Sequence, residues 1–282
     1  MKRIDCHQHL LYPERFTYDW TADFPALAGR AFRLDEYRAA ASGLEVAGAV
    51  FMEVDVPFVE AAAEAAFFGD LADDAANGIS GVVAACRPEN GDITGWLHST
   101  AHPRLCGYRR VLHTQPDDLS TTADFRENIA RIGQAGLTFD LCVLPRQHAI
   151  AEELVDCCPE TRFILDHCGV PDIASGNLDS WRTSIKELSR RSNLACKISG
   201  IIAYAAGVIT AETLRPAVEH VIDCFGWNRV IWGSDWPVCN LTRDLATWTR
   251  LLDDVLADCS EDELARLYHR NARLIYQLKP LP

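Results

Sequence analysis

The stretch Arg3-Ile-Asp-Cys-His-Gln-His-Leu10 decides between two α/β folds. Residues 3–7 form a short β-like run that is typical of a first strand. A doubly wound sheet would usually carry a glycine-rich phosphate-binding turn directly after that strand. Gln8-His9-Leu10 follows here instead, without a glycine. The opening of the chain therefore favours a barrel.

Seven further β-like runs alternate with helical segments. With Arg3–His7, the predicted strands are Gly48–Val54, Ile79–Ala85, Leu105–Val111, Leu137–Val143, Arg162–His167, Leu194–Ser199 and Arg229–Gly233. The predicted helices are Leu34–Leu44, Phe58–Ala76, Thr122–Gln134, Ala149–Cys158, Leu178–Arg191, Ala211–Phe225, Asp244–Asp258 and a last helix to Tyr276, which the capping box Ser260-Glu-Asp-Glu263 opens. This alternation predicts an α/β protein, a single (β/α)₈ TIM-type barrel domain over residues 1–282.

Composition restricts the class of protein further. The chain has 282 residues, of which 48% are hydrophobic and 24% charged, and its net charge of −13 argues against nucleic acid and membrane surfaces as partners. Its 11 cysteines include no Cys-x-x-Cys pair, so we expect reduced thiols in a cytoplasmic protein. Polar residues interrupt any signal-peptide core near the N-terminus, and no apolar stretch of ~18 residues predicts a membrane span.

Four polar residues stand at the ends of predicted strands, where a barrel carries its active residues. His7 and His9 are two apart, so on an extended segment both imidazoles point to one side and could share a metal ion or a substrate oxygen. His167 ends the sixth strand, and it could instead be a core histidine bonded to Asp166 or to backbone. Asp235 lies in an apolar stretch, where it could cap the next helical segment or act as a general base or metal ligand.

Two cations and two further side chains complete the candidate site. Arg109 and Lys197 stand in strands of an acidic protein, where they could hold substrate oxygens. They could also form internal ion pairs, for instance with Glu53 or Asp140. We expect Arg109, Lys197, Glu53 and Trp20 to bind substrate. Trp20 lies in the long irregular segment after the first strand, which could cap a pocket.

The other histidines lie in predicted helices or loops and are treated as background. His113 and His148 are the exceptions, because they follow the fourth and fifth predicted strands. These two histidines are second-choice site residues.

Several motifs together resemble one branch of a known superfamily. They are Ile4-Asp-Cys-His-Gln-His9, Gly107-Tyr-Arg-Arg-Val-Leu112, Gly136-Leu-Thr-Phe-Asp-Leu141, Phe163-Ile-Leu-Asp-His-Cys-Gly169, Cys196-Lys-Ile-Ser-Gly200, Arg229-Val-Ile-Trp-Gly-Ser-Asp-Trp-Pro-Val238 and Asn271-Ala272. The first is similar to the first strand of the amidohydrolase superfamily. The combination is similar to the amidohydrolase-2-type lactonases, which include L-fuconolactone, L-rhamnonolactone and 2-pyrone-4,6-dicarboxylate lactonases. The likeness runs over nearly the whole chain and implies a distorted (β/α)₈ barrel that hydrolyses a cyclic ester.

The resemblance also implies roles for particular residues. It matches His7 and His9 to the strand 1 pair, His167 to the strand 6 histidine, Asp235 to the strand 8 acid and Arg109 to a substrate-contacting arginine. Two-metal members of the superfamily add a bridging Lys or Glu on strand 4 and a histidine on strand 5, which this chain lacks. We therefore expect at most one divalent metal, zinc first, held by His7, His9 and Asp235 with His167 as a further candidate. The same residues also fit a metal-independent site.

The mechanism expected on this basis is opening of a sugar (aldono) lactone by water that Asp235 activates. His167 is the second expected catalytic residue, and imidazoles or the metal would polarise the carbonyl group. A metal-dependent decarboxylase or amidase is the alternative within the superfamily. A non-catalytic sugar-acid binding protein is the alternative from another class. The expected partner is a small-molecule lactone, and the sequence leaves the oligomeric state open.

Overall fold

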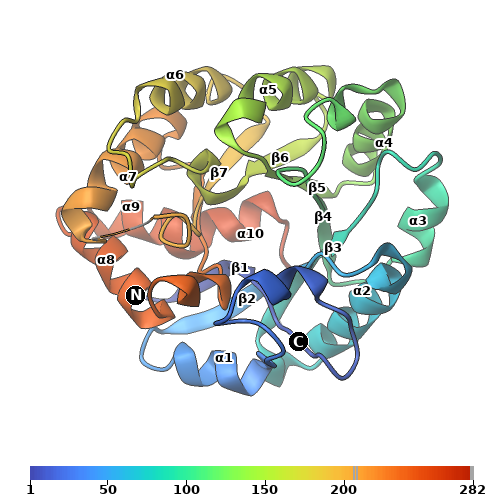
Figure 1. Cartoon of the computed structure of the whole chain (residues 1–282), viewed down its shortest axis with the longest axis horizontal. Coiled ribbons are helices and arrows are strands. Elements are labelled where there is room, and N and C mark those ends of the chain that lie inside the picture. Colours follow the sequence, from blue (N-terminus) through green and yellow to red (C-terminus); the bar gives the residue numbers. More distant parts are fainter. Residues whose placement is uncertain (206, 208, 280–282) are drawn as a thin grey trace.

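The computed structural model describes residues 1–205, 207 and 209–279, and a sheet of eight parallel strands in sequence order forms its centre (Figure 1). The strands are β1 (Arg3–Gln8), β2 (Val46–Met52), β3 (Ile79–Ala85), β4 (Leu105–Val111), β5 (Thr138–Cys142), β6 (Arg162–Leu165), β7 (Leu194–Ile198) and β8 (Val230–Trp232). Each predicted strand overlaps one of these, which confirms the predicted barrel. Apolar runs suit these strands because helices cover the outer face of the sheet and side chains fill its interior.

Helices surround the barrel between the strands (Figure 1). They are α1 (Leu34–Ala40), α2 (Phe58–Asp73), α3 (Thr94–Ser99), α4 (Ala123–Gln134), α5 (His148–Cys157), α6 (Asp179–Leu188), α7 (Ala211–Phe225), α8 (Leu245–Val255), α9 (Glu261–Ala265) and α10 (Asn271–Ile275). The predicted helices are confirmed, several with shorter ends. The sequence analysis does not predict α3, because its six residues are too few to show helical periodicity.

Helix α7 shows how the outer ring attaches to the barrel. The Thr210 hydroxyl accepts a hydrogen bond from the backbone N–H of Thr213 and so caps the start of the helix. Leu214, Val218 and Val221 are buried at spacings of four and three residues, which places them on one helix face. That apolar stripe packs toward the strands.

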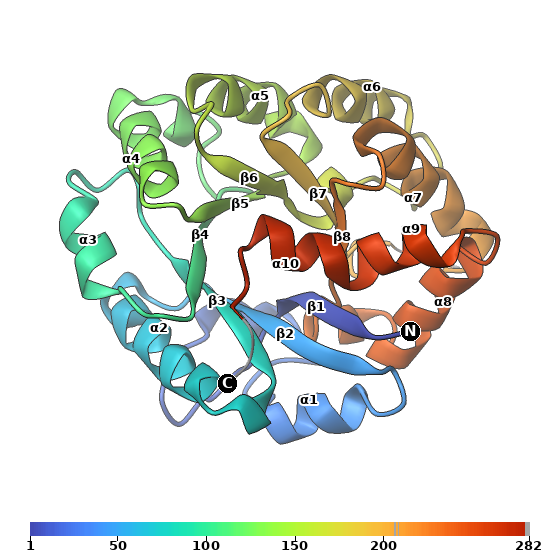
Figure 2. The same ribbon diagram turned by 180° about the vertical axis from the view of Figure 1, so that it is seen from behind.

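The predicted C-terminal helix is divided into three parts. Ser260 caps α9 by accepting from the backbone N–H of Glu263, as the capping box predicts, and a π-helical turn over Arg266–Arg270 then leads into α10. Figure 2 shows this segment lying across the barrel on the side opposite the view in Figure 1. Leu278 lies beside Gly81, near the start of β3. The segment therefore covers the end of the barrel where the strands begin.

The barrel closes between β1 and the segment that follows β8. The backbone N–H of Asp235 donates to the carbonyl oxygen of His7 at 2.8 Å, and His9 N–H donates to the Trp236 oxygen at 2.8 Å. Gly233 permits this approach, because a Cβ atom there would lie 2.7 Å from the Cβ of His7. The closing seam thus brings together the polar ends of the first and last strands.

The cysteines form no disulfide, and all 11 are free thiols. Cys6 and Cys106 pack with apolar side chains inside the barrel, where cysteine acts as a small hydrophobic residue. Within the described residues, no helix is both long and apolar enough to cross a membrane.

Candidate active site

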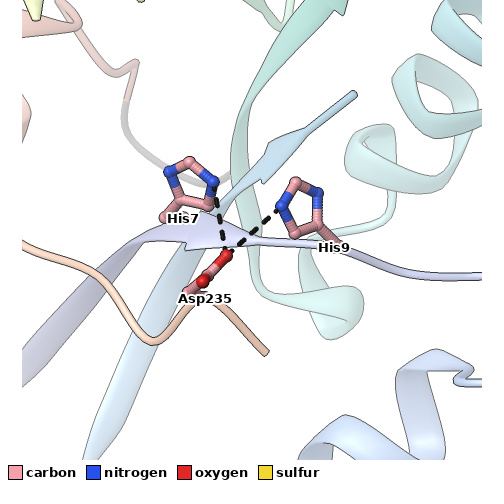
Figure 3. A group of neighbouring side chains, drawn as sticks. All are labelled: His7, His9 and Asp235. Atoms are coloured by element: carbon pink, nitrogen blue, oxygen red, sulfur yellow. Dashed lines mark ion pairs between the residues drawn. The ribbon is translucent and has the colours of Figure 1, made fainter. Parts of the chain in front are cut away.

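Asp235, His7 and His9 meet at the end of the barrel where the strands stop (Figure 3). Asp235 Oδ1 lies 3.6 Å from His7 Nε2 and 3.5 Å from His9 Nε2. All three residues are buried. Asp235 Oδ2 has no hydrogen-bond partner in the described part of the chain. A buried carboxylate oxygen is costly without a partner, so this atom is available to a water molecule, a substrate or a metal ion.

A sharp turn after β8 directs the Asp235 side chain toward the histidines. Its φ angle is +57°, in the left-handed region where aspartate is enriched among non-glycine residues. Its backbone oxygen accepts from Cys239 N–H at 2.8 Å. The short 3-10 helix Val238–Leu241 that follows has no side-chain cap. The capping alternative for Asp235 is therefore wrong, because its side chain faces His7 and His9 instead.

The orientation of His9 is set by a backbone carbonyl group. His9 Nδ1 lies 2.9 Å from the Met52 oxygen at the end of β2, and an oxygen acceptor requires the proton on Nδ1. The other ring nitrogen, Nε2, then faces Asp235 Oδ1. A histidine held in this way by its other ring nitrogen is a common arrangement among metal ligands.

His7 lies between two buried cations. Its Nδ1 is 3.0 Å from Lys197 Nζ, and its Nε2 is 3.3 Å from Arg109 Nη1. Asp166 Oδ1 lies 3.4 Å from the same Nδ1 and partly balances the ammonium group. Burial and the charge of Lys197 lower the pKa of His7 well below its ordinary value. The His7 imidazole is therefore neutral near pH 7.

His167 stands beside this cluster and lines the adjoining cavity. Its Nδ1 lies 3.0 Å from the Ser199 hydroxyl, and its ring centre is 4.5 Å from that of His7. Burial lowers the pKa of His167. Gly200 makes room for this ring, because a Cβ there would lie 2.2 Å from His167 Nδ1 and 2.8 Å from Asp235 Oδ2. The structure thus brings all four strand-end residues of the prediction together.

Lys197 is fully buried inside the barrel, beneath the cluster. Its ammonium group donates to Asp140 Oδ1 at 2.6 Å and to Asp166 Oδ1 at 2.7 Å. The Tyr276 hydroxyl donates to the same Asp140 oxygen at 2.7 Å. Burial disfavours the charged amine, but these two carboxylates raise the pKa of Lys197 above its ordinary value. These contacts are those of the internal ion-pair alternative. They adjoin the site at His7, which Lys197 contacts, and at Arg109, whose Nη1 lies 3.8 Å from Asp166 Oδ2.

Arg109 lines the cavity and is held from behind by Glu53. Its Nε donates to Glu53 Oε1 at 2.6 Å, and its Nη2 donates to the Glu53 backbone oxygen at 2.7 Å. Although burial opposes ionisation, the Arg109 guanidinium lowers the pKa of Glu53. Arg109 Nη1 extends to His7. Glu53 thus orients Arg109, and only the guanidinium of the pair lines the cavity.

The cavity beside the cluster has a volume of about 390 Å³ and is bounded by both aromatic and acidic side chains. Trp20 forms part of the wall, and its Nε1 donates to the Val54 oxygen at 2.9 Å, which holds the long segment after β1 against the end of β2. Phe24 lines the cavity beside it, as do Asp23 and Asp55. The pocket-capping expectation for this segment therefore agrees with the position of Trp20.

Several lining residues have no role in the sequence analysis. Asp23 and Phe24 lie in the irregular segment, and Tyr204 lies in the loop after β7, where no periodic pattern marks a residue as functional. Cys142 ends β5, and this position at a strand end is the sequence signal that could have marked it as a site residue. His113, a second-choice candidate, lines the same cavity, whereas His148 does not, being bonded to Ser184 and Gly169 behind β6.

A comparison with protein families identifies the family of the chain. The family described as Amidohydrolase matches residues 4–278. The chain belongs to the amidohydrolase family. This match confirms the predicted superfamily and the prediction of a hydrolase.

Individual relatives are consistent with the lactonase branch of the amidohydrolases. One is an L-fucono-1,5-lactonase of Burkholderia multivorans, 28% identical over 85% of this chain and 83% of the relative. Another is an L-fucono-1,5-lactonase of Burkholderia ambifaria, 33% identical over half of each chain. A crystal structure of a Burkholderia multivorans amidohydrolase with bound zinc shares the fold, with a TM-score of 0.90 and 24% identity over 99% of this chain and all of the other.

The donor atoms of this amidohydrolase fit one divalent cation. His7, His9 and Asp235 each offer a ligand atom, and these atoms lie within 4.8 Å of one another. Asp235 Oδ1 lies against Nε2 of both imidazoles, so these three atoms suit a cation, whereas Oδ2 has no partner among the described residues. A second group, His7 with Asp166 and His167, also satisfies this distance. It shares Asp166 with the Lys197 ammonium, so we favour the first group.

Proposed function

We propose that the chain hydrolyses the cyclic ester of a sugar lactone. The observation that carries this proposal is the Asp235 carboxylate, which is buried beside His7, His9 and His167 and has one oxygen without a partner. Such a carboxylate can take a proton from water at the moment of attack. The adjoining cavity of about 390 Å³ is large enough for a small ring.

The two oxygens of Asp235 have different surroundings and therefore different roles. Oδ1 faces His7 and His9, whereas Oδ2 is free. Oδ2 accepts a proton from water as the water oxygen bonds to the lactone carbonyl carbon. When the ring C–O bond breaks, the protonated carboxyl group returns that proton to the leaving alkoxide. The product is the open-chain hydroxy acid, and Asp235 is ready for another turnover.

Stabilisation of the carbonyl oxygen is the second requirement of the reaction. Arg109 supplies a guanidinium at the cavity wall, and Glu53 holds it in position. His7, His9 and Asp235 Oδ1 would hold a divalent ion such as zinc, which when bound polarises the carbonyl group as a Lewis acid. His167 also lines the cavity, and we propose that it contacts the reacting oxygens there. Gly200 leaves the space that the His167 ring occupies.

The charges around the cavity favour a neutral polyhydroxy lactone over a dicarboxylate lactone. Asp23, Asp55 and Asp235 line it, and Arg109 is the one guanidinium or ammonium group among the described lining residues. That guanidinium is already paired with Glu53. Carboxylates accept hydrogen bonds from sugar hydroxyls but repel a second carboxylate. Trp20 adds an apolar face on which sugar C–H groups can pack.

The test is acid release from a panel of aldonolactones and dicarboxylate lactones, followed with a pH indicator. We expect turnover of at least one aldonolactone and a kcat lower by about 10²–10⁴-fold in Asp235→Asn, which keeps the side-chain shape but removes the base. Asp258→Asn, on the exposed surface after α8, is the matched control. Near-normal turnover by Asp235→Asn would refute the mechanism. If no lactone is opened but carbon dioxide is released from a benzoate-type acid, the protein is a decarboxylase and the proposed lactone hydrolysis is wrong.

A further inference from the structure

A histidine–cysteine pair lines the cavity outside the Asp235 cluster. His113 lies two residues after the end of β4, and Cys142 ends the neighbouring strand β5. The backbone N–H of His113 donates to the Cys142 oxygen at 3.1 Å, and His113 Nδ1 lies 3.1 Å from Cys142 Sγ. Both side chains line the same cavity as Asp235 and His167. Two adjacent strand ends therefore present this pair to whatever the cavity binds.

The pair has a defined proton arrangement when both groups are neutral. Burial lowers the pKa of His113 to about 4 and raises the pKa of the Cys142 thiol above its ordinary value. A thiol that donates to Nδ1 leaves the single proton of the neutral imidazole on Nε2. Within the described residues, His113 Nε2 has no hydrogen-bond partner among the side chains and backbone groups around it. In this tautomer His113 adds a neutral N–H donor to a cavity wall whose charged donor is Arg109.

We propose that His113 binds an oxygen of the substrate through Nε2–H, and that Cys142 is the positioning residue that holds His113 in this tautomer. The oxygen is a hydroxyl or ring oxygen of a neutral polyhydroxy lactone, because a neutral imidazole donates one hydrogen bond without adding charge. The identity of the substrate rests on the proposed lactonase function. The proposed tautomer does not, since it is inferred from the contact between Nδ1 and Sγ.

The kinetic experiment compares three variants on the aldonolactone that the wild type opens fastest. His113→Phe keeps a ring of similar size but removes the donor, and we expect KM to rise about 3–10-fold with kcat changed less than about 3-fold. Cys142→Ser keeps a donor to Nδ1 and should retain the wild-type KM. Cys142→Ala frees the imidazole to take either tautomer and should raise KM. His98→Gln, on exposed α3, is the control and should change neither constant.

The tautomer is measured separately by long-range ¹H–¹⁵N correlation of the histidine rings, with His113→Phe used to assign the signals. We expect a protonated Nε2 and an unprotonated Nδ1 at His113 in the wild type and in Cys142→Ser, and a mixture in Cys142→Ala. A proton on Nδ1 in the wild type would overturn the assignment of Cys142. Loss of kcat by orders of magnitude in Cys142→Ser would show a nucleophile instead of a positioning thiol.

These readouts separate this proposal from the lactonase function. If the wild type turns over lactones and His113→Phe keeps its KM, the substrate contact is refuted and the lactonase function stands. If the wild type opens no lactone, the lactonase function and the substrate contact both fall. The ring spectra then still decide whether Cys142 sets the tautomer of His113.

Discussion

The backbone N–H of Asp235 donates to the carbonyl oxygen of His7 at 2.8 Å, across the seam that closes the barrel. This bond fixes the distance between a strand 8 acid and a strand 1 histidine more firmly than side-chain contacts alone would. His9 donates to Trp236 in the same seam, so both imidazoles are held to the segment that carries the acid. The same hydrogen bonds therefore close the barrel and bring the residues of the candidate site together.

Replacement of Gly200 by alanine should disable the site. The new Cβ would lie 2.2 Å from His167 Nδ1 and 2.8 Å from Asp235 Oδ2, which real atoms do not tolerate, so His167 must move. We expect kcat on the identified lactone to fall by more than about 10-fold, as a small misplacement of reacting groups is costly. Gly176→Ala has a similar φ of +70° but meets nothing within 4 Å, so it should retain activity. Equal activity of the two variants would contradict this prediction.

Metal-free protein titrated with zinc should bind one ion per chain at the His7, His9 and Asp235 group. His9→Gln removes the ligand whose orientation the Met52 carbonyl sets, and we expect at least about a 10-fold weaker dissociation constant by isothermal titration calorimetry. His98→Gln should bind zinc as the wild type does. Unchanged binding by His9→Gln would place the ion elsewhere, with the second group that contains His167 as the next site to examine.

Lys197 should matter for stability because its removal leaves two buried carboxylates without their ammonium partner. Asp140 and Asp166 are both within 2.7 Å of its ammonium group, and all three residues are buried. We expect Lys197→Met to lower the free energy of unfolding by about 3–5 kcal/mol in urea denaturation. Lys186→Met, on the exposed face of α6, should change it by less than about 0.5 kcal/mol. A Lys197→Met protein as stable as the wild type would mean that this ion-pair network contributes little.

His148 should make stability depend on pH in the acidic range. It is buried between Ser184 and Gly169, and burial lowers its pKa to about 4. The unfolded chain, with a histidine pKa of about 6.5, binds more protons between these two pKa values. The contribution of His148 to stability is therefore fully present above pH 6.5 and is lost as the pH falls toward 4. At pH 4 this difference in pKa lowers the free energy of unfolding by about 3 kcal/mol.

The measurement for His148 is urea denaturation of the wild type and His148→Gln at several pH values. The glutamine variant should lose less stability between pH 6.5 and pH 4 than the wild type, although it is less stable at pH 7. Parallel curves for the two proteins would rule out His148 as the source of the pH dependence.

The strands and most helices could be predicted from the sequence because their signals are local. Near-continuous apolar runs mark β3 and β4, whose predicted bounds agree with the structure, and helical periodicity does the same for α7. Helix ends were less accurate, since α1 ends at Ala40 rather than Leu44. The short α3 carries no periodic signal.

The roles of the cations could not be predicted in the same way. Arg109 and Lys197 look alike in the sequence, as strand cations in an acidic protein. Glu53 turns Arg109 toward the cavity, whereas Asp140 and Asp166 hold Lys197 inside the barrel. The partners come from other strands of the barrel, since Glu53 follows β2 and Asp140 lies in β5, so they depend on the register of the sheet and on which face each side chain occupies.

The sequence by itself determined the alternation of strands and helices, the barrel, and the side-by-side placement of His7 and His9, because each follows from periodicity over a few residues. Only the tertiary structure decided which oxygen of Asp235 is free, that Lys197 lies beneath the site, and that Cys142 contacts His113. Those features join residues far apart in the chain. Their geometry is set by closure of the barrel and by the lateral register of its strands, which no local pattern records.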